Sequence, residues 1–272
     1  YNTGGSQIQL ISNRIFRDPS AWYNFHVIFD RAAANPAHRI RIYVNGVEET
    51  DWATDQRSNI SSSSSSGWNV SGLTAAINRR SGGVDSRYHN GYLAQFYNID
   101  GAVVAPTEFA ETNGGVWVPK EYSGTYGNNG WLLEFKQTGT GTGAANTVGA
   151  DTSGRDNHWD SSGIASTDVV PDSPTNNWST LNPLKVNDRT QTFAECDLDF
   201  SSTQTSSNPA VTSTFAVTSG KWYWEVYIRA KGNDVNSVGI ASNPNDLEND
   251  TSALYSKTTA YSYQANGQKH NN

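Results

Sequence analysis

Residues 38–45 constrain the fold of this chain most, because apolar and polar side chains alternate along them. The apolar positions are Ile40, Ile42 and Val44, and the intervening positions are Arg39, Arg41 and Tyr43. This alternation is typical of a β-strand that buries one face and exposes the other. We therefore expect the three apolar side chains to be buried and the two arginines to be exposed. Asn45-Gly46 follows and favours the positive φ angles of a two-residue hairpin, so a return strand should begin at Val47.

Segments with the same strand character recur along the chain. They are residues 22–30, 91–100, 131–135, 192–200, 211–217, 221–229, 238–241 and 260–264. In the first of these, Phe25, Val27 and Phe29 are expected to share a buried face. Residues 106–111 have room for one helical turn, and no longer stretch carries apolar residues at helical spacing. The sequence therefore predicts an all-β chain.

The composition supports folded β structure, and it argues against nucleic acid as a partner and against insertion into a membrane. Aromatic residues make up 11% of the chain, with 9 Trp, 13 Tyr and 9 Phe, and these supply enough apolar area for cores despite only 17% charged residues. The net charge of −7 argues against nucleic acid as a partner, because no basic stripe is available for a phosphate backbone. No stretch approaches the roughly 20 apolar residues of a membrane-spanning helix, so membrane insertion is not expected.

The 272 residues are long enough for two domains. We predict a first sandwich over 1–118, a connector rich in Gly, Asn and Pro over 119–189 that wraps the first domain, and a second sandwich over 190–272. Six consecutive serines at 61–66 predict a surface loop. Methionine is absent and the chain stops within a strand pattern, so we expect a fragment of a longer polypeptide.

Several motifs carry a family resemblance. Residues 17–23, the hairpin at 42–47, residues 91–97 and residues 109–120 resemble laminin-G-like domains of the concanavalin A-like superfamily, in the version found in phage tail-fibre and virion-fibre proteins. Residues 121–135, 151–154 and 172–177 resemble the continuation of those proteins. Residues 219–226, followed by 238–241 and 261–272, resemble the opening of a SPRY domain. The resemblance implies a concanavalin A-like jelly-roll sandwich that lacks N-terminal strands, followed by a truncated SPRY-like sandwich.

The same resemblance implies a place and a role. It implies a virion-surface or tail-fibre protein, extracellular, that attaches to host-surface polysaccharide and contacts other virion proteins. It also implies a homo-oligomer, with a trimer favoured. One alternative is a purely structural fibre or decoration component without a ligand, and a second is a glycan hydrolase.

The most enzyme-like motif lies at Glu195, Asp197 and Asp199, which would share one face if residues 192–200 formed a single strand. Concanavalin A-like glycosidases use paired carboxylates on such a strand. Here the motif ends in Asp where that family has Glu, and it lies outside the first sandwich, so a solvated edge strand is the favoured interpretation. Cys196, the one cysteine, should be a thiol without a disulfide. No other catalytic motif is found, and we expect a protein that is not an enzyme.

Calcium is the one cofactor that the sequence suggests, and none is required by it. Asp151, Asp156 and Asn157 form an oxygen-rich loop, and carboxylate and amide oxygens are the ligands that Ca²⁺ prefers. The alternative is that these side chains form turns, which is the commoner role of Asp and Asn.

Glycan recognition calls for aromatic faces beside polar groups on loops. The tryptophans in polar, loop-like surroundings are Trp52, Trp68, Trp117, Trp159 and Trp178. From these and a neighbouring loop we single out Trp68, Tyr88, Arg87 and Trp52 as candidate glycan-binding residues. The alternative is that most of these side chains cover the core. In contrast, Trp22, Trp131, Trp222 and Trp224 lie in predicted strands and are expected to pack.

Overall fold

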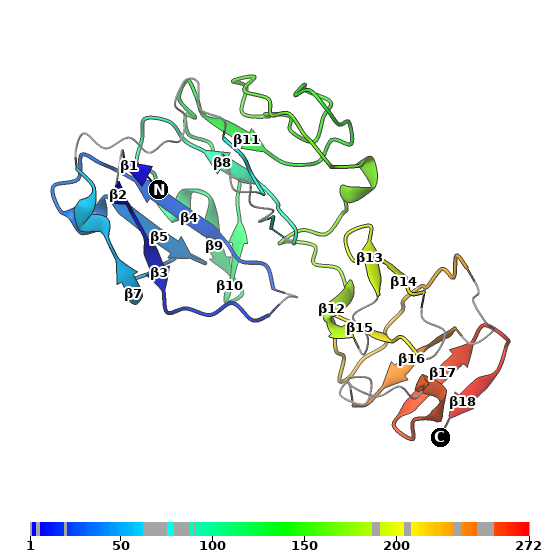
Figure 1. The fold of residues 1–272 in the computed structure, drawn as a ribbon. Coiled ribbons are helices and arrows are strands. Elements are labelled where there is room, and N and C mark those ends of the chain that lie inside the picture. The colour runs from blue at the N-terminus through cyan, green and yellow to red at the C-terminus, as the bar shows by residue number, and fades with distance from the viewer. Residues whose placement is uncertain are drawn as a thin grey trace. The chain divides into compact units, whose positions relative to one another are not determined.

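The computed structural model is all-β, as predicted (Figure 1). It describes residues 2–3, 6–18, 21–61, 75–78, 88–89, 91–186, 191–203, 208–230, 236–243 and 253–271. Over these ranges every helix is a 3-10 turn of three residues. None of the helices described is long and apolar enough to cross a membrane.

The chain divides into two compact units, residues 1–178 and residues 179–272. Residues 119–178, most of the predicted connector, therefore belong to the first unit. They contribute one strand (Trp131–Leu133), the last residue of another (Pro119), three isolated bridges and several buried residues.

The first unit contains short antiparallel strands and 3-10 turns. The strands are β1 (Asn2–Thr3), β2 (Ser6–Gln7), β3 (Leu10–Ser12), β4 (Phe25–Phe29), β5 (Ile40–Val44), β6 (Val47–Glu48), β7 (Trp52–Asp55), β8 (Phe96–Asn98), β9 (Ala110–Asn113), β10 (Val116–Pro119) and β11 (Trp131–Leu133). The 3-10 turns are η1 (Pro36–His38), η2 (Arg57–Asn59), η3 (Pro106–Glu108) and η4 (Ser166–Asp168). The pairs are β1–β2, β3–β7, β9–β10 and β8–β11, beside the three-stranded sheet β4–β5–β6. The helical turn predicted at 106–111 is confirmed as η3.

The predicted hairpin between β5 and β6 is confirmed. Val44 pairs with Val47, and the two residues between them have φ angles of 49° at Asn45 and 78° at Gly46. Asn and Gly tolerate these angles best, so the local sequence specifies the turn.

The prediction for the buried face of β4 is wrong. Phe25 and Val27 are 56% and 61% exposed, whereas Ile28, on the opposite face, is only 7% exposed. His26 shares the face of Ile28, and its ring lies 5.4 Å from that of Phe109 in the aromatic core. The unit places its core on the His26 side, and alternation within a strand does not reveal which side that will be.

The prediction for β5 is correct in part. Val44 is buried and Ile40 and Ile42 are half-buried, but Arg39 and Arg41 are also half-buried. The guanidinium of Arg39 donates to the carbonyls of Ala33 and Ile60, so it ties neighbouring loops to the strand.

An aromatic core organises the first unit. Its buried members are Phe109, Tyr122 and Tyr126, and the half-buried residues Tyr97, Ile99, Val104 and Leu132 pack against them. The rings of Phe109 and Tyr122 stack at 4.6 Å, a contact that adds about 0.5–1.5 kcal/mol beyond burial. Burial raises the pKa of Tyr126 to about 12, which keeps its hydroxyl neutral. Trp131 of β11 is almost completely buried between Phe96 and Trp159.

The second unit contains seven described strands and one 3-10 turn. They are β12 (Leu181–Val186), β13 (Thr192–Ala194), β14 (Asp199–Ser201), β15 (Val211–Ser213), β16 (Ser237–Ala241), β17 (Ala260–Gln264), β18 (Lys269–Asn271) and η6 (Leu254–Ser256). β12 pairs with β15, β13 with β14, and β16, β17 and β18 form a three-stranded sheet. Within β17, Ser262 and Gln264 are buried while Tyr261 and Tyr263 are exposed, the reverse of the usual pattern.

Two strand predictions in this unit are wrong. Residues 192–200 form the hairpin β13–β14 rather than one strand. Residues 221–229 have no regular secondary structure, and Trp222 and Trp224, expected to pack, are largely exposed.

Candidate functional site

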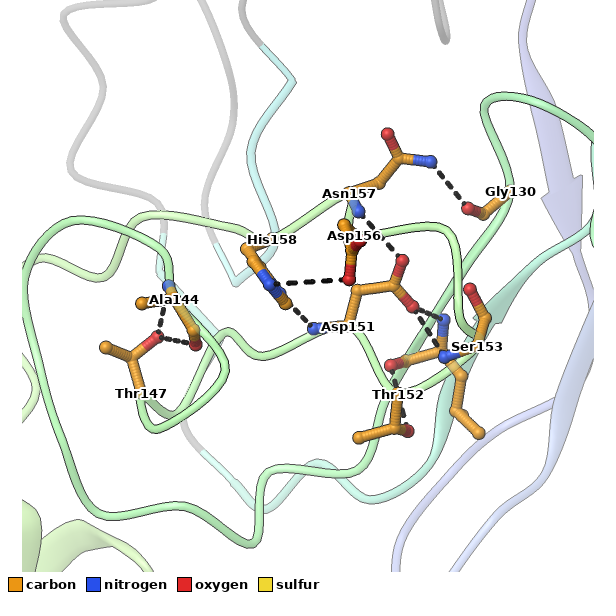
Figure 2. Close-up of polar contacts among 10 residues, drawn as sticks. Gly130, Ala144, Thr147, Asp151, Thr152, Ser153, Asp156, Asn157 and His158 are labelled. Carbon is orange, nitrogen blue, oxygen red and sulfur yellow. Dashed lines mark hydrogen bonds and ion pairs between the residues drawn. The ribbon is translucent and has the colours of Figure 1, made fainter.

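The most connected polar cluster centres on Asp151, directly after the buried residues 147–150 (Figure 2). Its side chain is almost inaccessible, with the residue only 5% exposed. One carboxylate oxygen accepts the backbone N–H groups of Leu132 and Ser153, each at 2.9 Å, and the other accepts that of Asn157 at 2.9 Å. One carboxylate thus connects strand β11 to both sides of the 151–157 loop.

His158 and Asn157 complete this cluster. The backbone N–H of Asp151 donates to Nδ1 of His158 at 2.9 Å, so a neutral His158 ring carries its proton on Nε2. The amide nitrogen of Asn157 donates to the carbonyls of Asn128 at 3.1 Å and Gly130 at 2.8 Å. Figure 2 shows these side chains converging on one loop.

The pKa of Asp151 reports the balance of forces at this position. Burial alone would raise the pKa, because the charged form loses hydration. The hydrogen bonds from Leu132, Ser153 and Asn157 stabilise the charged form, and the pKa lies below its ordinary value. The donors therefore outweigh the cost of burial.

The three candidate calcium ligands do not form an oxygen cage in this arrangement. Asp151 already accepts three N–H groups, and Asn157 directs its amide nitrogen at carbonyls. Asp156 is exposed, with Oδ1 4.0 Å from Nε2 of His158. Across the described ranges no group of three or more His, Cys, Asp or Glu side chains could hold a metal ion. Calcium binding at this loop would require Asp151 to release its donors, and it stays a prediction.

The candidate catalytic carboxylates do not share a strand face. Glu195, Cys196 and Asp197 have φ angles of 51°, 55° and 59°, which turn the chain between β13 and β14. Asp199 forms an ion pair with Arg229, and burial raises the pKa of Asp197. The geometry of paired carboxylates that the sequence suggested is therefore absent from this segment. Cys196 is a thiol, half-buried in the same turn.

Trp52, a candidate glycan-binding residue, lies in β7 and is half-buried. The guanidinium of Arg57 lies 5.2 Å from its ring centroid. Asp55 holds that guanidinium in a 2.6 Å ion pair, and Arg57 also donates to the carbonyl of Ala37 at 2.7 Å. Arg57 and the ion pair thus fix one side of the indole.

Trp117 and Trp159 also act in packing. The Trp117 ring covers the β5–β6 turn, where a Cβ on Gly46 would come within 2.8 Å of it. Its Nε1 donates to the side chain of Asn24 at 3.1 Å. Trp159 meets the buried Trp131 edge to face, at 5.0 Å.

Trp178 differs from these three, because it is 51% exposed on a braced loop. Its backbone N–H donates to Oδ1 of Asp172 at 2.8 Å. Ser173 and Asn176 exchange backbone hydrogen bonds of 3.2 and 3.0 Å, which close a tight turn between them. By its sequence context Trp178 is one of the five loop tryptophans, but it is not among the four candidate glycan-binding residues. The sequence feature that could have singled it out is the run of Pro, Asp and Asn over 171–177, which favours a fixed turn.

Of the remaining candidates, Tyr88 is 65% exposed and lies in an isolated bridge position. Trp68 and Arg87 lie outside the described residues, and their role in glycan binding stays a prediction. Searches against protein-family models, curated proteins and solved structures found no match for this chain.

Proposed function

We propose that this chain is an attachment module of a virion surface or tail fibre, which recognises host-surface polysaccharide through loop aromatics. The laminin-G-like and SPRY-like motifs in the sequence support this context. The all-β architecture supports it too, since sandwich folds present loops on a rigid scaffold. In this proposal the first unit is a concanavalin A-like sandwich, the second is SPRY-like, and neither is an enzyme.

The observation that carries the proposal is the exposed indole of Trp178 on its braced loop. A sugar ring presents C–H surfaces that stack on an aromatic face, while its hydroxyls need amide and carboxylate partners. Asp172 and Asn176 supply a carboxylate and an amide just before Trp178, where they also accept the Trp178 backbone N–H and donate to the carbonyl of Pro171 at 3.5 Å. A pre-formed turn lowers the ordering cost of binding. Tyr88, with Trp68 and Arg87, forms the second set of candidates.

Such contacts are weak singly and gain strength by repetition. A homo-oligomer presents several copies of each loop, and linked binding raises avidity by about a hundredfold or more through effective concentration. The motifs that resemble fibre proteins favour a trimer. Host polysaccharide and other virion proteins are the proposed partners, with the virion surface as the location.

The proposal is tested by replacing the loop aromatics in the full chain. Trp178→Ala and Tyr88→Ala should each weaken adsorption to host cells or purified host polysaccharide at least about tenfold, since one lost stacking contact costs about 1–2 kcal/mol and avidity multiplies it. The melting temperature should change little, because both side chains are exposed. Tyr261→Ala removes an exposed aromatic from β17 of the second unit, and this variant should bind normally.

Normal adsorption by both loop variants would contradict the assignment of these residues. If the wild-type chain also fails to bind any host glycan, the structural role without a ligand replaces the proposal.

A further inference from the structure

The exposed indole of Trp178 lies beside a carboxylate. Oδ1 of Asp172 accepts the backbone N–H of Trp178 at 2.8 Å. The indole is joined to that N–H through Cα, so the whole ring lies within about 10 Å of the carboxylate. The Debye length at physiological ionic strength is about 8 Å, so salt screens only part of the interaction between Asp172 and a charged group on the ring.

No cation neutralises Asp172 within the part of the chain that the structure describes. There its carboxylate forms no ion pair, and Oδ2 accepts no hydrogen bond. The sequence has no Lys or Arg between Arg155 and Lys185. A ligand that reaches this turn therefore meets an uncompensated negative charge.

The net charge of the chain is concentrated in the same stretch of sequence. Residues 100–178 contain ten of the 26 Asp and Glu residues and three of the 19 Lys and Arg residues, a net charge of −7. The other residues contain 16 of each kind, so their charges balance. Of the three cations, Lys136 is already paired with Glu134 at 2.5 Å. A polyanion approaching this part of the first unit would meet charge of its own sign, which lowers its rate of encounter.

We infer that the polysaccharide recognised at Trp178 carries no acidic group on the sugar that stacks there, and that Asp172 sets this specificity. The inference rests on the proposed attachment function and adds the class of ligand to it. That class comprises polymers of neutral hexoses and of N-acetylhexosamines.

Two effects of Asp172 favour such sugars. A sugar hydroxyl that donates to Oδ2 makes a charge-assisted hydrogen bond, which is roughly twice as strong as a bond between neutral groups. An acidic sugar brings a second carboxylate, which is repelled. With an effective dielectric constant of about 40–80, two like charges about 8 Å apart weaken binding about two- to sixfold at one contact. Specificity is the difference between the two affinities, so the two effects add.

The specificity is tested on the full chain with an array of host-surface polysaccharides that includes hyaluronan, alginate and polygalacturonate. Each acidic polymer is placed beside its carboxyl-reduced form, in which every uronic acid has become the corresponding neutral hexose. The wild-type chain should bind the reduced member of a pair at least about fivefold more tightly than the acidic member. Raising the salt concentration to about 1 M, where the Debye length is about 3 Å, should reduce this preference.

Asp172→Asn separates the local charge from the charge of the whole chain. The variant keeps a side-chain oxygen that can accept the Trp178 N–H, so the turn and the melting temperature should change little. It should lower the preference for the reduced member at least about twofold. Glu111→Gln is the matched control, because it removes one negative charge from an exposed position in β9 and should keep the wild-type preference.

Equal or tighter binding of the acidic members would overturn the inference and leave the attachment function standing. A preference that Asp172→Asn leaves unchanged, or that Glu111→Gln lowers equally, would overturn the role of Asp172. Absence of binding to every polymer of the array, neutral or acidic, would instead contradict the attachment function on which the inference rests.

Discussion

At the scale of single residues, Asp151 has the sequence context of a metal ligand, but its carboxylate stabilises a loop by accepting backbone hydrogen bonds. Its loop has the Asp and Asn content of a calcium site, yet its oxygens accept three backbone N–H groups. Sequence alone does not distinguish these roles, because both require the same oxygen atoms. The distinction depends on Leu132, which is distant in sequence and reaches the loop only through the fold.

Asp151→Asn should destabilise the first unit by about 2–4 kcal/mol. Hydrogen bonds to a buried charge are worth about 1.5–3 kcal/mol, and the side-chain NH2 group of the new Asn would face a backbone N–H, so that two donors oppose each other. Denaturant unfolding measures the change. Asp156→Asn is the matched control, since Asp156 is exposed and its replacement should alter stability by about 0.5 kcal/mol or less. Equal effects of the two substitutions would contradict the bracing role.

The lowered pKa of Asp151 also predicts a pH dependence. The folded-state pKa lies below the ordinary value of 3.8, so this contribution to stability is fully present above about pH 4. It is lost as the pH falls through the folded-state pKa, where the carboxylate becomes protonated. Urea unfolding across this acid range should show a steeper loss of stability in the wild type than in Asp151→Asn. Parallel curves for the two proteins would contradict the assignment.

At the scale of elements, the β5–β6 hairpin depends on one glycine for two reasons. Gly46 has a φ of 78°, and its Cα faces the ring of Trp117. The turn thus joins a local requirement for positive φ to a tertiary contact. Trp117 in turn is fixed by its hydrogen bond to Asn24.

Gly46→Ala should destabilise the first unit by about 2–4 kcal/mol, of which about 1–2 kcal/mol is the cost of positive φ for alanine. The remainder is displacement of Trp117, since a Cβ would lie 2.8 Å from its ring. Gly101→Ala is the control, because Gly101 has a φ of 82° and nothing within 4 Å of its Cβ position. The control should lose only the φ contribution, as measured by denaturant unfolding. Equal losses would show that Trp117 adapts without cost.

The same elements show what sequence can predict. The all-β class, the 45–46 turn and the 3-10 turn η3 were predictable, because alternation, Asn-Gly and Pro act over a few residues. The buried face of β4 was not, since it depends on where Phe109 packs. The turn at 195–197 was missed because it uses positive φ without Gly or Asn.

For the candidate site, the sequence could predict only the type of residue, a tryptophan on a loop, and not which tryptophan it would be. Five loop tryptophans met the same local criteria, and exposure, a tertiary property, separates Trp178 from Trp117 and Trp159. Trp52 met the same criteria, but in the structure the guanidinium of Arg57, paired with Asp55, covers one side of its ring. Ranking these residues requires the contacts, not the pattern.

At the scale of the whole molecule, the two compact units differ in what they expose. The first contains the loop with the exposed Trp178, and the second contains the exposed apolar side chains of 221–229. In the proposed homo-oligomer, association multiplies the number of loops available to one polymer, which strengthens attachment by weak glycan contacts.

The measurement that tests attachment most directly is binding of the wild-type chain to an array of host-surface polysaccharides, with reducing-sugar release followed on every glycan bound. We predict saturable binding to at least one polysaccharide and no release of reducing ends. Absence of binding to every host glycan would contradict the attachment function, and release of reducing ends would show that the protein is a hydrolase.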